Sequence, residues 1–217
     1  MVTRRKRFKE SLGVIRFTGA GLLVLSLLIL AGPVAAAPAA AKTLDNLMVA
    51  FNGESNAHAK YVEFAKKAES EGYLGVASLF KAAAKAEEIH AARHAEVIKK
   101  LGGTPKAEIK LPEIKSTAEN LKAALEGETY ERDKMYPEFI TQAKAENNKD
   151  AVRAFNFAVK AEAQHAVLYA EASGNLEKWK DAKKFMVCPE CGNTVLSVDF
   201  KKCPVCFTPA EKFIPIA

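Results

Sequence analysis

Cysteine is scarce in this chain. The 217 residues include four cysteines, and all of them lie between residues 188 and 206. The long segment before them has no disulfide available and must fold by burying apolar side chains. No cysteine lies near the apolar N-terminal segment, which argues against lipid attachment there.

A broad excess of positive charge is also lacking. The formal net charge is +6, but the first 16 residues hold six basic side chains and one acidic side chain. They account for +5 and leave the rest of the chain near +1. The basic balance is therefore local, and we expect no nucleic-acid partner.

The N-terminus has the composition of an export signal. A basic start is followed by an uncharged stretch over residues 17–41, with its apolar part at 22–30 and an alanine-rich end. This order is typical of a secretory signal peptide, and we predict one over residues 1–41. An uncleaved membrane anchor is the alternative. Arg4-Arg5 adds a twin-arginine signal as an alternative to an ordinary basic start. Both main interpretations place the remainder outside the cytoplasm, in a periplasmic or other extracytoplasmic compartment.

Residues 42–174 are mainly helical by pattern. Apolar residues recur at helical spacing over 43–71, 73–101, 117–146 and 150–172. Ser116 begins a capping box, and Pro137 should kink the third helix. Two helical hairpins joined by a longer crossover at 106–115 predict a mainly α, ferritin-like four-helix bundle. A charged linker at 175–184 leads to a small second domain at 185–217, too short to fold on burial alone.

One short pattern occurs twice in the helical region. Each copy has a Gly-Glu pair on one predicted helix and a Glu-x-x-His motif on the next. Residues three apart share a helix face, so the two copies can direct carboxylates and imidazoles to one point. This is the ligand pattern of a di-iron site in a four-helix bundle. The candidate ligands are Glu54, Glu87, His90, Glu128, Glu131, Glu162 and His165.

Buried carboxylates argue for cations among them. A single Glu-x-x-His motif usually lies on a solvated helix face, but two copies at matched distances are not explained in that way. Burying one bare carboxylate costs several kcal/mol, so a cluster requires positive charge. A site rich in carboxylate and poor in imidazole suits iron, with manganese as the alternative, better than zinc or copper.

The two copies are not identical. Three residues after Glu54 stands Ala57, whereas three residues after Glu128 stands Glu131, so one half carries a spare carboxylate. Tyr61 and Tyr136 follow the lone glutamates by about two helical turns, and each phenol could donate a hydrogen bond to a ligand carboxylate, with plain core packing as the alternative.

Four further residues near the motifs have less specific interpretations. His58 and His94 have no counterpart in the other copy, and we interpret them as surface or near-site histidines rather than ligands. Gly53 and Gly127 sit inside helices at a cost of about 1 kcal/mol each. We expect them to allow close helix packing beside the site.

The C-terminal segment carries a second metal motif. Cys188, Cys191, Cys203 and Cys206 have the spacing C-x2-C-x11-C-x2-C. Two such pairs supply four thiolates to one tetrahedral ion. The spacing fits zinc, which would make a structural ribbon, and iron, which would make a one-electron carrier.

With these motifs in place, residues 43–217 resemble the rubrerythrin family. Gly-Glu-Ser at 53–55, Glu-Glu-Ile-His at 87–90, Gly-Glu-Thr-Tyr-Glu at 127–131, Met-Tyr-Pro at 135–137 and Glu-Ala-Gln-His at 162–165 precede the cysteine pairs in the family's order. The resemblance implies a di-iron bundle followed by a rubredoxin-like iron domain. It implies reduction of hydrogen peroxide to water in oxidative-stress defence, in a homodimer or higher homo-oligomer paired head to tail.

The resemblance also implies individual roles. Glu87 and Glu162 would bridge the irons, and Glu54 and Glu128 would be terminal ligands. His165 would hold one iron, while Glu131 and His90 alternate at the other; these two, with Tyr61 and Tyr136, are the candidate catalytic residues. An export signal departs from the family's usual cytoplasmic location, so the electron donor stays unidentified.

Two alternatives are open at this point. The bundle alone would fit a ferroxidase or iron-storage protein, although such a protein has no need of a four-cysteine domain. A bundle with a zinc ribbon would fit a non-enzymatic interaction module.

Overall fold

The computed structural model describes residues 40–217. The predicted signal peptide or membrane anchor, residues 1–41, therefore lies almost entirely outside the described residues. Within residues 40–217, no helix is both long enough and apolar enough to span a bilayer.

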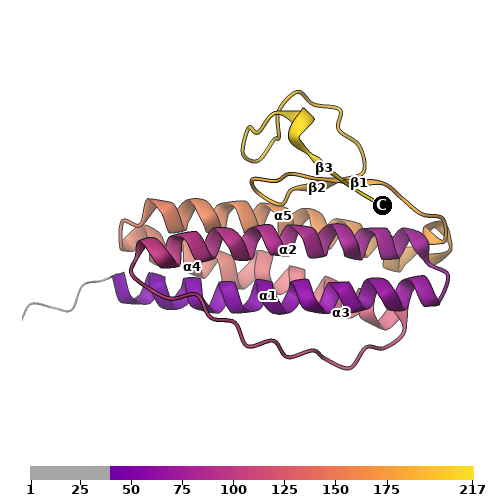
Figure 1. Ribbon diagram of the computed structural model, residues 1–217, viewed down its shortest axis with the longest axis horizontal. Helices are drawn as coiled ribbons and strands as arrows, with labels where there is room; N and C mark the ends of the chain where they lie inside the picture. Colours follow the sequence, from indigo (N-terminus) through magenta and orange to yellow (C-terminus); the bar gives the residue numbers. More distant parts are fainter. Residues whose placement is uncertain (1–39) are drawn as a thin grey trace, which may run out of the picture. The chain divides into compact units, whose positions relative to one another are not determined.

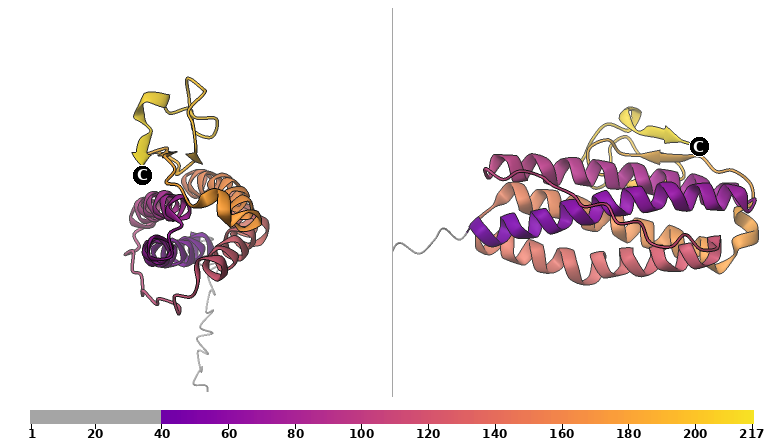
Figure 2. Two further views of the ribbon diagram at one scale, coloured as in Figure 1. Left: turned by 90° about the vertical axis from the view of Figure 1, so that its right-hand side faces the viewer. Right: turned by 60° about the horizontal axis from the view of Figure 1, so that its bottom comes forward.

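The described chain begins with a bundle of long helices (Figures 1 and 2). They are α1 (Ala40–Ser70), α2 (Leu74–Lys100), α3 (Thr117–Tyr130), α4 (Tyr136–Ala145) and α5 (Lys149–Gly174). A π-helical turn, η1 (Glu131–Met135), joins α3 to α4, so that α3, η1 and α4 form the third long helix of the bundle. The bounds lie within three residues of those predicted from the apolar spacing.

Local sequence signals determine where these helices begin and end. Gly72 and Gly102 have φ of +80°, a conformation that glycine adopts without steric cost, and they close α1 and α2. Ser116 accepts a hydrogen bond from the Glu119 N–H in a complete capping box at the start of α3. Asn148 caps α5 by accepting from the Ala151 N–H.

The interruption near Pro137 takes the form of the π turn. Proline has no N–H to donate, and it stands at the beginning of α4, directly after η1. A π turn accommodates one extra residue in a helix. This explains how Tyr136, eight residues after Glu128, can occupy a position equivalent to that of Tyr61, seven residues after Glu54.

The bundle core consists of two apolar clusters. One is centred on aromatic side chains that include Tyr61, Phe64, Phe80 and Tyr169. The other includes Leu47, Ile98, Tyr136 and Phe155. The polar residues of the double motif are buried between these clusters.

The crossover between α2 and α3 runs along α1 (Figure 1). Two asparagines one helical turn apart hold it there by hydrogen bonds to its backbone. The Glu108 N–H donates to Asn52 Oδ1 at 2.8 Å, and the Lys110 N–H donates to Asn56 Oδ1 at 2.7 Å. Asn56 Nδ2 also donates to the Glu108 carbonyl at 2.9 Å. The crossover is therefore bound to α1 at residues 108–110.

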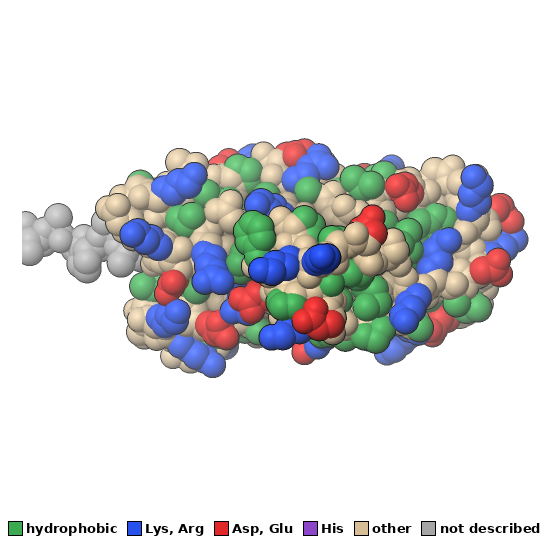
Figure 3. All heavy atoms as spheres, turned by 90° about the horizontal axis from the view of Figure 1, so that it is seen from above, with side chains coloured by type: hydrophobic (Ala, Val, Ile, Leu, Met, Phe, Trp, Pro, Cys, Tyr) green, Lys and Arg blue, Asp and Glu red, His purple; other side chains and the backbone are tan. Residues whose placement is uncertain are grey.

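The C-terminal domain is a small antiparallel sheet on the α2 and α5 side of the bundle (Figure 2). Its strands are β1 (Phe185–Val187), β2 (Thr194–Val195) and β3 (Ile214–Ile216), in the order β2-β1-β3. A 3-10 turn, η3 (Ala210–Lys212), precedes β3. Figure 3 views the molecule from this side and shows basic, acidic and apolar side chains interspersed over the face.

The linker is more ordered than its charged composition indicates. It contains the 3-10 turn η2 (Leu176–Trp179), and Trp179 is buried and stacked on Phe185, with ring centroids 6.3 Å apart. A Cβ atom at Gly75 on α2 would lie 2.6 Å from the Asp181 carbonyl oxygen. Glycine at this position therefore lets the linker approach the α2 backbone closely.

Candidate metal centres

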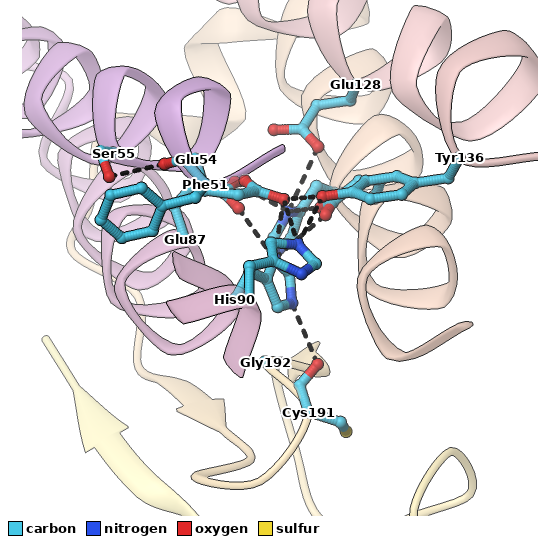
Figure 4. A network of polar contacts seen from close by, with 12 residues as sticks. Phe51, Glu54, Ser55, Glu87, His90, Glu128, Tyr136, Cys191 and Gly192 are labelled. Atoms are coloured by element: carbon cyan, nitrogen blue, oxygen red, sulfur yellow. Dashed lines mark hydrogen bonds and ion pairs between the residues drawn. The ribbon is translucent and has the colours of Figure 1, made fainter. Parts of the chain in front are cut away.

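Six of the seven predicted bundle ligands converge at the centre of the bundle (Figure 4). Each long helix contributes: α1 and α3 one glutamate each, α2 and α5 a Glu-x-x-His motif each. All six side chains are at most 1% exposed. The six residues are Glu54, Glu87, His90, Glu128, Glu162 and His165.

These side chains form two overlapping groups, in each of which the potential ligand atoms lie within 4.8 Å of one another. Glu54 and His90 belong to one group and Glu128 and His165 to the other, while Glu87 and Glu162 belong to both. The Nδ1 atom of His90 lies 3.0 Å from Glu87 Oε2 and 3.1 Å from Glu162 Oε1. The His165 Nδ1 atom lies 3.0 Å from Glu162 Oε2. This arrangement suits two ions that share two carboxylates.

Several buried ligand atoms have no hydrogen-bond partner in the described part of the chain. They are Glu54 Oε2, Glu87 Oε1, Glu128 Oε2, both oxygens of Glu162 and Nδ1 of His165. A buried polar atom without a partner costs free energy that a native fold rarely leaves uncompensated. Cations at the centre would bind these atoms, so the donor set fits a dinuclear site. Its oxygen-rich composition suits iron or manganese.

The pKa values of the metal-free cluster also indicate that it needs bound positive charge. Burial, together with the neighbouring carboxylates of Glu87 and Glu162, raises the pKa of Glu54 well above its usual value. Burial works to lower the pKa of His90, but the carboxylates of Glu162 and Glu87 outweigh it and raise this pKa to about 10. Without metal, protons thus supply the positive charge that the cluster needs.

Two buried tyrosines hold the terminal carboxylates from the opposite helix. The Tyr61 hydroxyl on α1 donates to Glu128 Oε1 on α3 at 2.6 Å, and the Tyr136 hydroxyl on α4 donates to Glu54 Oε1 on α1. Burial and the adjacent glutamates raise the pKa of both phenols well above the usual value, so both remain donors. The expected phenol–carboxylate bonds are present, and they run across the bundle.

Glu131 is the predicted ligand that does not join the others. It lies at the start of the π turn η1, is partly exposed, and belongs to neither group of converging atoms. The resemblance implies that His90 and Glu131 alternate at one ion. In this structure His90 is the one that lies near Glu54. Glu131 nevertheless lies near the cluster, because burial and the carboxylates of Glu128, Glu162 and Glu87 raise its pKa well above the usual value.

One expectation about neighbouring residues needs revision, and the interpretation of His58 as a non-ligand agrees with the structure. A Cβ atom at Gly53 would meet nothing within 4 Å, and one at Gly127 would meet only Lys60 Nζ at 3.9 Å. The expectation that these glycines allow close helix packing is therefore wrong. His58 is half-buried, with Nδ1 2.7 Å from the Ala84 carbonyl oxygen, and takes no part in the site.

His94 lies closer to the site than the sequence could indicate. It is fully buried, and its Nε2 atom is 3.1 Å from the Tyr136 hydroxyl oxygen and 3.8 Å from Glu54 Oε1. Burial and the adjacent His90 lower the pKa of His94 to about 3, so its imidazole is neutral. Its position one turn beyond a Glu-x-x-His motif was the only sequence signal for this role.

The four cysteines form a second candidate centre in the C-terminal domain. All four thiols are free, and their sulfur atoms lie within 4.8 Å of one another. Cys188 and Cys206 are 3.5 Å apart, and Cys191 and Cys203 are 3.6 Å apart. A hydrogen bond from Cys191 lowers the pKa of the Cys188 thiol to about 5, which favours thiolate formation. The set suits one tetrahedral ion.

The C-terminal domain contacts both imidazoles of the bundle site. His90 Nε2 lies 3.1 Å from the Cys191 carbonyl oxygen, and His165 Nε2 lies 3.1 Å from Thr194 Oγ1. Thr194 donates its own hydroxyl hydrogen to the Gly192 carbonyl, so it accepts from His165. Each imidazole therefore points Nδ1 at the bundle centre and donates Nε2–H to the domain. Such partners fix ring orientation in metal sites.

An arginine adds to this contact. Arg93 on α2 donates through Nε to the Glu190 carbonyl at 3.0 Å and forms an ion pair with the Glu190 carboxylate. The resemblance implies that a partner chain's domain lies near the bundle site. In this structure the chain's own domain contacts the bundle site, and the pairing of chains stays a prediction.

We predict that Gly192→Ala will separate the two domains. Gly192 has φ of +73°, and a Cβ atom there would clash with His90 Nε2. The clash and backbone strain should cost about 1–3 kcal/mol and expose the linker. Faster trypsin cleavage within residues 175–184 would report this. Gly174→Ala is the matched control, because a Cβ atom there meets nothing within 4 Å. Equal cleavage rates in both variants would contradict the prediction.

We also predict that metal binding to the bundle releases protons. The raised pKa values of Glu54 and His90 mean that the metal-free cluster carries protons that ions must displace. Affinity for a divalent ion should therefore rise from about pH 6 to about pH 8. Calorimetric titration in buffers of different ionisation enthalpy measures the number of protons released. Binding without proton release would show that the cluster is already ionised.

Comparison with known proteins agrees with this geometry. The rubrerythrin family model matches residues 45–173. Nigerythrin from Nitratidesulfovibrio vulgaris is 42% identical over 176 residues, which cover 81% of this chain and 87% of that protein. A rubrerythrin from Porphyromonas gingivalis is 34% identical, covering 81% of this chain and 90% of that one.

Solved structures of similar proteins share this fold. Nigerythrin in its fully reduced, all-ferrous state superimposes with a TM-score of 0.75 at 37% identity, covering 86% of this chain and 91% of that one. A bacterioferritin from Desulfovibrio desulfuricans matches with a TM-score of 0.61 at 23% identity, covering 68% of this chain and 88% of that one, and shows the fold alone. With the family model, the relatives and the two clusters of ligand residues in agreement, the chain belongs to the rubrerythrin family.

Proposed function

We propose that this protein is a non-haem di-iron peroxidase that reduces hydrogen peroxide to water. The observation that carries the proposal is the contact between its two candidate centres. The backbone of Cys191, a residue of the four-thiol cluster, accepts a hydrogen bond from His90, a residue of the carboxylate cluster. A one-electron centre beside a two-metal centre suits a reaction that consumes two electrons.

The proposed metals are two iron ions in the bundle and one iron in the four-cysteine site. When bound, the two ferrous ions supply two electrons, which with two protons convert one hydrogen peroxide to two waters. All-ferrous nigerythrin is a solved relative, which supports iron in the bundle. The four-cysteine cluster, holding iron in place of zinc, would be the electron carrier.

The chain's own residues would hold and tune this centre. The carboxylates of Glu87 and Glu162 reach both ion positions. The phenols of Tyr61 and Tyr136 keep the terminal carboxylates oriented by hydrogen bonds. Glu131 at the π turn lies near the carboxylates of Glu162 and Glu87, and it would replace His90 when the charge of the centre increases. The apolar clusters on both sides exclude water from the site.

The path for electrons would pass through the domain contact. Cys191 provides both a thiol to the four-sulfur cluster and a carbonyl to His90 Nε2. His90 in turn directs Nδ1 at the bundle centre. One residue thus separates the cysteine cluster from an imidazole of the bundle. The external electron donor is unidentified.

The remaining parts of the proposal concern setting and partners. We propose that the protein is exported, acts against oxidative stress outside the cytoplasm, and assembles as a homodimer or higher homo-oligomer. The ferroxidase or iron-storage alternative shares the bundle, but it does not account for a cysteine domain that contacts both imidazoles of the site.

Substitution of a shared carboxylate tests the proposal. The reduced protein should consume one hydrogen peroxide for every two electrons, and Glu162→Ala should lower the rate by at least a hundredfold, because Glu162 contributes to both ion positions. Peroxide consumption is followed with an electrode under anaerobic conditions. Glu171→Ala, an exposed glutamate on the same helix, is the control. Full turnover by the Glu162 variant would eliminate this mechanism.

Metal analysis with an optical spectrum of the purified protein tests the electron carrier separately. Iron in the four-cysteine site gives intense thiolate absorption in the visible range, and we expect that colour together with about three irons per chain. A colourless protein containing one zinc would favour the interaction-module alternative.

A further inference from the structure

We propose that His94 is a positioning residue of the bundle site, which directs the Tyr136 hydroxyl onto Glu54 and so strengthens one of the two ion positions. This inference rests on the metal-binding part of the proposed function. It does not depend on peroxide chemistry. His94 lies outside the repeated motif, and none of the ligand roles above uses it.

The hydrogen-bond directions follow from the number of protons available. The Tyr136 hydroxyl carries one hydrogen, and it donates that hydrogen to Glu54 Oε1. The oxygen of Tyr136 can then only accept, and His94 Nε2 at 3.1 Å is the donor. His94 therefore carries a hydrogen on Nε2. The chain of hydrogen bonds runs from His94 through Tyr136 to Glu54.

Packing alone does not explain an imidazole at this position. His94 and Tyr136 are both fully buried, and their rings pack against Phe155 with centroids 5.4 Å and 5.8 Å away. The His94 Nδ1 atom has no hydrogen-bond partner in the described part of the chain. A buried polar atom without a partner destabilises a fold, and an apolar side chain would avoid that cost. The favourable contribution of His94 therefore comes from the hydrogen bond between Nε2 and the Tyr136 hydroxyl.

The hydrogen bonds from His94 through Tyr136 to Glu54 act on one of the two ion positions. Glu54 belongs to the group with Glu87, His90 and Glu162, and not to the group around His165. On the other side, Tyr61 donates to Glu128, but its ring neighbours are Phe64, Phe80 and Tyr169. Those rings include no imidazole. His94 therefore makes the two ion positions unequal.

The contact acts by removing freedom from Glu54. A phenol that both accepts and donates is held at two points, so its hydroxyl cannot rotate away from the carboxylate. Glu54 Oε1 is then fixed, and Oε2, which has no other partner, is left to face an ion. Hydrogen bonds of this kind around metal sites typically change affinity by 10–100-fold.

Cobalt titration of the metal-free full-length protein tests the inference. The visible spectrum of Co²⁺ separates ions bound to thiolates from ions bound to oxygen and nitrogen. His94→Leu should weaken one of the two bundle ions by about tenfold and leave the other bundle ion and the four-cysteine ion unchanged. Tyr136→Phe should do the same. The double variant should lose no more than either single variant, because both break one chain of hydrogen bonds.

Two controls separate positioning from packing. His94→Gln places an amide N–H near the position of Nε2 and should restore most of the affinity, whereas Leu fills the space without a donor. Tyr61→Phe removes the hydrogen bond to Glu128, so its effect should fall on the other ion and add to that of His94→Leu. Circular dichroism of each metal-free variant verifies the fold.

Three results would overturn the inference. They are a His94→Leu variant that binds both bundle ions as the unmodified protein does, equal losses in the Leu and Gln variants, and additive losses for His94→Leu and Tyr136→Phe. Unmodified protein that binds fewer than two Co²⁺ ions in the bundle would overturn the dinuclear site as well. Loss of peroxidase activity with normal Co²⁺ binding would count against the proposed reaction alone.

Discussion

The structure depends on one electrostatic constraint, the burial of four carboxylates at the centre of an apolar bundle. Glu54, Glu87, Glu128 and Glu162 are all fully buried, between two clusters of hydrophobic side chains. Such a group is tolerable only with compensating positive charge. Protons can provide it, as the raised pKa of Glu54 indicates, and metal ions provide it better because they also bind the unpaired oxygens. Stability of the bundle and occupancy of the site are therefore linked.

The C-terminal domain takes part in the bundle site and is not simply attached to it. Cys191 and Thr194 accept the Nε2 hydrogens of the two imidazoles, while Arg93 and Glu190 pair beside them. The domain thereby fixes the rings whose Nδ1 atoms face the centre. Movement of the domain would loosen both histidines at once. Binding of ions, orientation of ligands and contact between the centres are consequently parts of one assembly.

The site also departs from the internal symmetry of the chain. The two tyrosines make equivalent bonds across the bundle, and the π turn compensates for the extra residue before Tyr136. Beyond that point the halves differ. Glu131 stands where the first copy has Ala57, and His94 backs only the Tyr136 side. The two groups of ligand atoms therefore have different surroundings.

The sequence by itself determined the helices, the ligand candidates and the cysteine centre. Helical periodicity, glycine and capping signals are local, and the Glu-x-x-His and Cys-x-x-Cys spacings follow from the geometry of one helix or one loop. Only the tertiary structure decided which phenol reaches which carboxylate, that Glu131 belongs to neither group of converging atoms, that no neighbouring helix packs closely on Gly53 or Gly127, and that the domain contacts both histidines. These facts depend on contacts between residues far apart in the chain, and local spacing carries no information about such distances.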